Sequence, residues 1–218
     1  MTPVPRWQFI VFDLDGVLID SRANMEAAWR DVQARCGYAV PFERYFAHIG
    51  LPFRDILRNL GLTDRLDEAE VTYARASIEY FDLIRVYPGV RDALAHLQRA
   101  GALLGIVTSK DAVRTALAVE RIGIAFDAVQ APATGLRGKP SPDQLLAAAH
   151  ALGIPPAEVL YVGDMAVDAL TARNAGAQYA HAAWGYGAAP MGTRLMLLDP
   201  GMLVDLVVAE RKAARIGA

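Results

Sequence analysis

Near the start of the chain, residues 8–21 read QFIVFDLDGVLIDS. The apolar run that ends at Phe12 is rich in branched and aromatic residues, which is typical of a buried β-strand. Asp13 and Asp15 follow directly, and a turn at Gly16 would bring both carboxylates into one site. We therefore expect a strand whose carboxyl end carries two acidic side chains.

Short apolar runs and helical patterns alternate along the second half of the chain. Strand-like runs occur at residues 103–107, 128–129, 159–162 and 178–182, and helical patterns at residues 90–100, 112–122, 142–152 and 167–175. This alternation is typical of a parallel sheet covered by helices on both faces. The predicted fold class is therefore α/β, with a Rossmann-like core.

The gap between the first two predicted strands, residues 13–102, is far longer than one crossover helix requires. It contains no strand signal, and Ser21 is expected to cap the first of several helices, at residues 22–36, 41–48, 53–60 and 64–84. We therefore expect an all-helical cap, residues 18–87, inserted into an α/β core made of residues 1–17 and 88–218.

Composition excludes several classes of protein. The chain has 218 residues, of which 54% are apolar, and a formal net charge of -2, so it is neither disordered nor a polycationic nucleic-acid binder. A single cysteine, Cys36, allows no intramolecular disulfide and fits no zinc spacing. No apolar stretch approaches the roughly 20 residues of a membrane span. We expect a cytoplasmic protein with no nucleic-acid or membrane partner, and the oligomeric state stays open.

Polar side chains follow the predicted strands, at the sheet edge where open parallel sheets bind their ligands. They are Asp13 and Asp15 after the first run, Thr108, Ser109 and Lys110 after the second, and Asp164 and Asp168 after the run at residues 159–162. Lys139, one of only three lysines in the chain, precedes the helical pattern at residues 142–152. We expect the acidic side chains to converge at one edge of the sheet.

Carboxylates crowded in this way would repel one another unless a cation lay among them. Oxygen ligands without His or Cys favour Mg²⁺, which normally completes its coordination shell with waters and substrate phosphate oxygens. Lys139 and the Thr108 hydroxyl would supply positive charge and a hydrogen-bond donor to the same anion. The sequence therefore predicts Mg²⁺ as cofactor and a small phosphorylated metabolite as partner.

Four segments resemble the motifs of the haloacid dehalogenase superfamily, in particular its phosphoglycolate-phosphatase-like members with a helical cap after the first motif. The segments are DLDGVLIDS at residues 13–21, VTSK at 107–110, GKPSP at 138–142, and GDMAVD at 163–168. Their order and spacing match over nearly the whole chain. Met165 and Ser109 depart from the residues common at their positions, Ser or Thr and Asn respectively.

The resemblance implies a role for each matched residue. Asp13 would be the nucleophile that forms an aspartyl-phosphate, and Asp15 the general acid and base. Thr108 and Lys139 would hold the phosphoryl group, with Ser109 as a further substrate contact. The implied metal ligands are Asp13, the main-chain carbonyl of Asp15, Asp164, and Asp168 either directly or through water.

One cap residue outside these motifs is a further candidate. The planar guanidinium of Arg54 could bind a substrate carboxylate or phosphate. Arginine is abundant in this chain, however, and a solvated helix face is the alternative.

The implied function is Mg²⁺-dependent hydrolysis of a phosphomonoester, with phosphoglycolate among the open substrates. Asp15 argues against dehalogenation, which has no leaving oxygen to protonate, and the lysine-free insert argues against a phosphonoacetaldehyde hydrolase, which needs a cap lysine. Two alternatives stay open: a phosphotransferase of the β-phosphoglucomutase type, and a non-catalytic regulator that binds a phosphorylated ligand.

Overall fold

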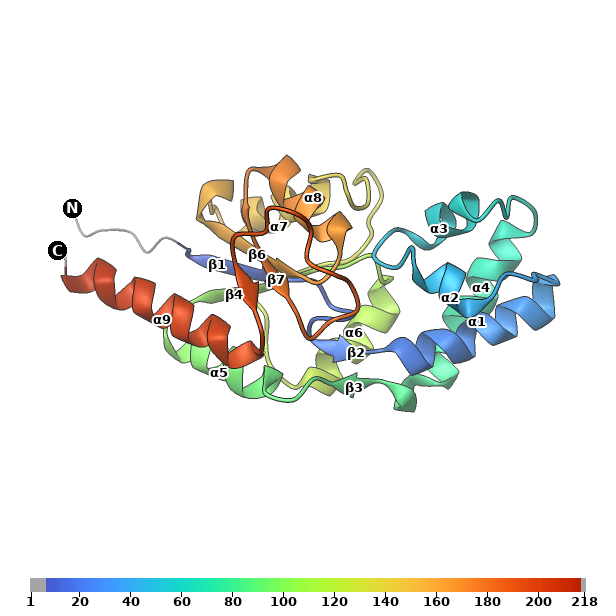
Figure 1. Cartoon of the computed structure of the whole chain (residues 1–218), viewed down its shortest axis with the longest axis horizontal. Coiled ribbons are helices and arrows are strands. Elements are labelled where there is room, and N and C mark those ends of the chain that lie inside the picture. Colours follow the sequence, from blue (N-terminus) through green and yellow to red (C-terminus); the bar gives the residue numbers. More distant parts are fainter. Residues whose placement is uncertain (1–6, 217–218) are drawn as a thin grey trace.

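A six-stranded parallel sheet forms the centre of the larger part of the molecule (Figure 1). The computed structural model describes residues 7–216, with side chains as far as residue 209. The strands lie in the order β5-β4-β1-β6-β7-β8. They are β1 (Phe9–Phe12), β4 (Leu103–Val107), β5 (Ala128–Gln130), β6 (Val159–Gly163), β7 (Gln178–Ala182) and β8 (Met196–Leu197). The predicted α/β class and parallel sheet are confirmed.

Helices cover both faces of this sheet, as alternating side chains of the buried strands require. Ile10 and Phe12 of β1 face an apolar cluster that includes α5 (Val90–Arg99), α6 (Ala112–Ile122) and α9 (Pro200–Ile216). Phe9 and Val11 face the opposite cluster, formed with α7 (Asp143–Ala151) and α8 (Ala166–Ala175). Burial on both sides explains why β1 reads as a continuous apolar run.

The second part of the molecule is helical and has an apolar core of its own (Figure 1). At its centre Trp29 stacks on Tyr45, with ring centroids 4.4 Å apart. Its helices are α1 (Arg22–Cys36), α2 (Phe42–Phe46), α3 (Phe53–Asn59) and α4 (Leu66–Glu79), followed by the 3₁₀ helix η1 (Phe81–Leu83). We call this part the cap.

Two short strands at the base of the cap were not predicted. β2 (Ile19–Asp20) and β3 (Arg85–Val86) pair antiparallel where the chain leaves the core and returns to it. Two residues per strand are too few to show a period-2 pattern in the sequence. The two strands pair because the outgoing and returning segments of the chain lie side by side here. The expectation of a purely helical insert is wrong at this point.

None of the helices described over residues 7–216 is both long and apolar enough to cross a membrane.

Candidate active site

The site is built at the carboxyl ends of the three central strands. β1 lies between β4 and β6, with Phe12 in register with Ile106 and Val162, so the residues that follow these strands meet at one edge. The Asp13 amide donates to the carbonyl of Val162 at 2.9 Å, which fixes the start of the first motif against β6. The structure thus brings together Asp13, Asp15, Thr108, Ser109, Asp164 and Asp168.

Lys139 joins the acidic residues of this edge. Its Nζ lies 2.8 Å from Asp13 Oδ1 and 2.8 Å from Asp168 Oδ1, and its side chain is 0% exposed. Burial alone would lower the pKa of Lys139, but the two carboxylates outweigh it and raise that pKa. Lys139 is therefore a permanent positive charge inside the site.

The oxygen atoms of Asp13, Asp164 and Asp168 form a group that fits a divalent cation. One ligand atom from each lies within 4.8 Å of the others, and all three residues are buried. Asp164 Oδ1 is buried without a hydrogen-bond partner, and Oδ2 accepts from the Tyr186 amide at 2.7 Å. Burial, together with Asp168 and Asp13, raises the pKa of Asp164 well above its usual range. An orphaned carboxylate oxygen among hard oxygen donors suits Mg²⁺.

Asp168 differs from the other two because both of its oxygens already accept hydrogen bonds. Oδ1 receives Lys139 Nζ and the Tyr161 hydroxyl, the latter at 3.3 Å, and Oδ2 receives the Met165 amide at 3.0 Å. Asp168 also lies in the first turn of α8, where it helps to cap the helix. These contacts orient Asp168 as a support of the site.

Asp15 faces the cap side of the site rather than the group of three carboxylates. Its Oδ1 lies 3.1 Å from Lys110 Nζ and also accepts a hydrogen bond from the Ser21 hydroxyl. Ser21 precedes α1 as expected, but its side chain makes no capping hydrogen bond, so its predicted capping role is wrong. The Ser21 hydroxyl donates to Asp15, and its oxygen accepts no hydrogen bond from the first amides of α1.

Lys110 is a site residue to which the sequence analysis gave no role. Its side chain is only 4% exposed, and burial lowers its pKa despite the neighbouring Asp15. Its backbone amide donates to Thr108 Oγ1 at 3.1 Å, which holds the Thr108 hydroxyl in place. The available signal was the rarity of lysine and its position directly after the Thr108-Ser109 pair at a strand end.

The loop after β7, whose sequence places it near the same edge but leaves its role open, encloses Asp164. A Cβ on Gly185 would lie 2.3 Å from Asp164 Cβ, and one on Gly16 would lie 2.2 Å from Asp164 Oδ2. Trp184 Nε1 donates to the Val17 carbonyl at 2.9 Å, and the Tyr186 hydroxyl receives the Ser21 amide at 2.7 Å. Glycines therefore permit the close approach, and the aromatic residues tie the loop to the first motif.

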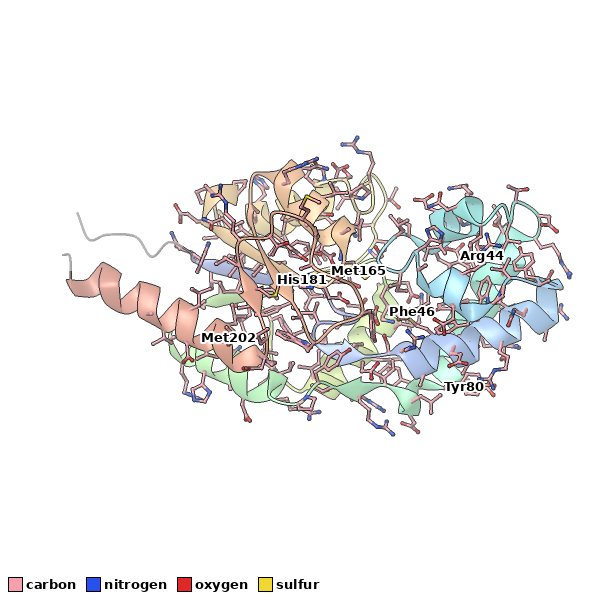
Figure 2. All side chains as sticks on the ribbon, viewed as in Figure 1. Arg44, Phe46, Tyr80, Met165, His181 and Met202 are labelled. Atoms are coloured by element: carbon pink, nitrogen blue, oxygen red, sulfur yellow. The ribbon has the colours of Figure 1, made fainter. Side chains whose placement is uncertain are left out.

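The cap closes the other side of the site. A cavity of about 50 Å³ lies between cap and core, and its walls include Asp13, Asp15 and residues of α1 to α4. The Ser109 hydroxyl donates to the Gly50 carbonyl at 2.7 Å, and Figure 2 shows Met165 where the core faces the cap. Ser109 therefore contacts the cap backbone and also lines the cavity, and its role as a substrate contact stays a prediction.

Arg54 lies away from this cavity. Its Nε donates to Glu70 Oε2 at 2.7 Å and its Nη2 to Asp67 Oδ1 at 2.6 Å, and its side chain is 39% exposed. The acidic residues of α4 hold it on the outer surface of the cap. The structure does not bring Arg54 to the site, in agreement with the solvated-face alternative.

A model of the haloacid dehalogenase-like hydrolase family matches residues 7–176. The chain belongs to this family. The resemblance of its four motifs is thereby confirmed, and the haloacid dehalogenase-like hydrolase described here is an enzyme.

Relatives of this hydrolase include a pyrophosphatase and a phosphoglycolate phosphatase. The pyrophosphatase PpaX of Bacillus velezensis is 33% identical over 80% of this chain and 82% of its own length. Phosphoglycolate phosphatase 1 of Pseudomonas aeruginosa is 31% identical over 99% of this chain and 83% of its own. The crystal structure of a haloacid dehalogenase-like hydrolase from Bacteroides fragilis is 27% identical, with a TM-score of 0.83 over 90% of this chain and 99% of that one.

Proposed function

We propose that this hydrolase is a Mg²⁺-dependent phosphatase that releases inorganic phosphate from a small phosphorylated metabolite. The observation that carries the proposal is the buried arrangement of Lys139 between Asp13 and Asp168, next to the unpartnered Asp164 Oδ1. This arrangement combines a nucleophile, a fixed positive charge and an oxygen group suited to Mg²⁺ around one point. The names of the relatives, a pyrophosphatase and a phosphoglycolate phosphatase, support the same chemistry.

In the proposed reaction Asp13 attacks the phosphorus atom, and the bond from phosphorus to the leaving oxygen breaks. Asp15 gives its proton to that oxygen. Asp15 then takes a proton from a water molecule that attacks the phosphorus, which releases phosphate and restores Asp13. Lys139 and Thr108 hold the phosphoryl oxygens during both steps.

Mg²⁺, when bound, would offset the negative charge of the phosphoryl group and of the carboxylates around it. Asp13, Asp164 and the main-chain carbonyl of Asp15 would hold the ion, with Asp168 as supporting ligand. In this proposal residues 18–87 form the cap, which excludes water from the first step. We also propose a cytoplasmic location, because the lone Cys36 needs no oxidising compartment.

Cavity size favours a small substrate over the hexose phosphate of the mutase alternative. A buried water occupies roughly 10–15 Å³ in a cavity of this kind, and the cavity between cap and core measures about 50 Å³. That space holds about three to five waters, so a compact ester requires less opening of the cap than a hexose phosphate does. Bulky esters would require the cap to open.

A screen of phosphorylated metabolites tests the proposal, with inorganic phosphate as the readout. We expect phosphate release that requires Mg²⁺, stops on addition of EDTA and is abolished in Asp13→Asn. Circular dichroism of the variant should match that of the wild type. Equal rates with and without Mg²⁺, or an active Asp13→Asn variant, would overturn the proposal.

A further inference from the structure

The cavity between cap and core is lined by two cations. Lys110 precedes α6 and Arg114 lies in its first turn, and both side chains line the cavity. They are 4% and 12% exposed, respectively. Each is paired with one carboxylate, Lys110 with Asp15 and Arg114 with Asp111, as buried cations usually are.

Arg114 is held in a fixed orientation but retains donors. Its Nε donates to Asp111, its Nη1 donates to the Ser77 hydroxyl at 3.2 Å, and its guanidinium lies 5.2 Å from the centre of the Tyr73 ring. These two hydrogen bonds use two of the five N–H groups of a guanidinium. The remaining donors are available to a ligand in the cavity that Arg114 lines.

Lys110 completes this arrangement from the side of the reacting atoms. Its Nζ lies 3.1 Å from Asp15 Oδ1, and Asp15 is the proposed proton donor to the leaving oxygen. An ammonium group carries three donors, of which Asp15 takes one. A leaving group that receives its proton from Asp15 is therefore within reach of Lys110.

The other walls offer little to a neutral, hydroxyl-rich leaving group. On the cap side, the apolar and aromatic residues that line the cavity are Met25, Tyr45, Ile49, Leu51, Phe53, Ile56 and Tyr73. Beyond Asp13 and Asp15, the described residues that line the cavity include no carboxylate and no amide side chain. Sugar hydroxyls need acceptors as well as donors, and the walls supply the hydroxyls of Thr108, Ser109, Tyr45 and Tyr73 but no further carboxylate or amide. The charges of Lys110 and Arg114 instead favour an anion.

We propose that Lys110 and Arg114 form a subsite for an anionic group on the leaving group, a carboxylate or a second phosphate. The inference rests on the proposed phosphatase function and narrows its substrate to small phosphate compounds with a second negative charge. During the reaction the bond from phosphorus to the leaving oxygen breaks and that oxygen takes the proton of Asp15. The anionic end stays on Lys110 and Arg114 and changes no covalent bond.

Three substrates with leaving groups of similar size test this subsite. They are 2-phosphoglycolate, which carries a carboxylate, pyrophosphate, which carries a phosphate, and 2-hydroxyethyl phosphate, which is neutral at the same position. In the wild-type enzyme with Mg²⁺ we expect kcat/KM for at least one anionic substrate to exceed that for the neutral one by roughly 10- to 100-fold, the size of charge-assisted hydrogen bonds. The preferred anionic substrate shows whether the subsite binds a carboxylate or a phosphate.

Variants assign the preference to the residues. Arg114→Met should remove most of the preference while changing kcat/KM for 2-hydroxyethyl phosphate by less than about threefold, and Arg114→Lys should restore part of it. Lys110→Met should also reduce the preference. Arg58→Met serves as the matched control, because Arg58 is an exposed cap arginine paired with Asp55.

The outcomes separate this inference from the proposed function. The subsite proposal would be overturned if the wild-type kcat/KM for 2-hydroxyethyl phosphate were as high as the values for both anionic substrates. It would also be overturned if Arg114→Met lowered kcat/KM equally for all three substrates. If the enzyme hydrolyses none of these three substrates but hydrolyses another phosphate ester in a reaction that requires Asp13, the subsite proposal is wrong and the phosphatase proposal still holds. If Arg114→Met does not fold, Arg114→Lys provides the test through a loss confined to the anionic substrates.

Discussion

Lys139 Nζ lies 2.8 Å from Asp13 Oδ1, and the two side chains are 0% and 5% exposed. An ion pair removed from water in this way has a large desolvation cost and is a weak stabiliser in itself. Asp168, at the same 2.8 Å from Lys139, and Asp164 leave the cluster with more negative than positive groups. The arrangement is therefore one that a divalent cation and a phosphoryl group would complete.

Replacement of Lys139 by Met should impair both stability and activity. The variant leaves Asp13 and Asp168 buried without their common partner, which typically costs about 3–5 kcal/mol of unfolding free energy. Loss of a preorganised charge at the phosphoryl group should lower kcat/KM on the order of 10²–10³-fold. Urea unfolding and phosphate release measure the two effects.

Arg137→Met is the matched control for this prediction. Arg137 is two residues away and pairs with Asp143, but its side chain is 79% exposed. Its removal should change neither stability nor activity appreciably. Equal effects of the two substitutions would contradict the role assigned to the buried pair.

The stability of the metal-free protein should fall as the pH rises. Burial raises the pKa of Asp13 to about 7, against the opposing effect of Lys139. The folded state then holds a proton that the unfolded chain releases near pH 3.9, so this stability is present at low pH and lost as the pH rises through about 7. Asp164, whose pKa is also raised by burial, acts in the same direction.

Urea unfolding in EDTA at about pH 5.5 and about pH 8 tests this sign. Asp13→Asn should reduce the difference between the two values, whereas Asp92→Asn, at an exposed position of α5, should leave it unchanged. Mg²⁺ should restore stability at the higher pH, because a metal ligand must be deprotonated to bind. A stability that rises with pH in EDTA would contradict the prediction.

The sequence was most informative where a residue's role depends on its place at a strand end. β1, β4 and β6 were recognisable as apolar runs, and a parallel sheet brings their carboxyl ends together whatever the side chains do. The convergence of Asp13, Thr108 and Asp164 was therefore predictable.

Side-chain direction was not predictable in the same way. Lys110 turns toward Asp15, and the Ser21 hydroxyl donates to the same carboxylate and does not cap α1. Arg54 follows the acidic residues of α4, whose positions relative to α3 depend on how the cap packs. Such pairings depend on tertiary contacts that no local pattern contains.

Gly16→Ala should inactivate the enzyme through Asp164. Gly16 has φ +85°, and an added Cβ would lie 2.2 Å from Asp164 Oδ2, so the carboxylate must move. Displacement of this proposed ligand should weaken Mg²⁺ binding, which isothermal titration calorimetry measures without reference to turnover. Gly37→Ala is the control, because Gly37 has φ +73° but no atom within 4 Å of the added Cβ.

The comparison separates backbone strain from close approach. Gly37→Ala should cost roughly 1–2 kcal/mol of unfolding free energy and leave Mg²⁺ affinity unchanged, because only the left-handed conformation is penalised. Gly16→Ala should show the same strain and in addition lose affinity for Mg²⁺. An unchanged affinity for Mg²⁺ in Gly16→Ala would show that the added Cβ does not displace Asp164 from the metal site.

Ser21→Ala should affect catalysis more than helix stability. The Ser21 hydroxyl makes no capping bond to α1 and instead donates to Asp15 Oδ1, while the Lys110 ammonium approaches the same oxygen. Without the hydroxyl, Asp15 keeps one of these two contacts and is less firmly oriented, so kcat should fall roughly 3- to 10-fold, the worth of one hydrogen bond. The effect should be on kcat rather than KM, because Asp15 acts on the leaving oxygen in the proposed reaction.

Asp111→Ala provides the contrast for stability. Asp111 does cap its helix, accepting from the Arg114 amide at 3.0 Å, and it also pairs with the Arg114 guanidinium. Its removal should therefore cost at least about 1 kcal/mol of unfolding free energy. Ser21→Ala should unfold at a urea concentration closer to that of the wild type. The prediction is wrong if Ser21→Ala loses as much stability as Asp111→Ala and keeps the wild-type kcat. In that case the Ser21 hydroxyl stabilises α1, and Lys110 alone orients Asp15.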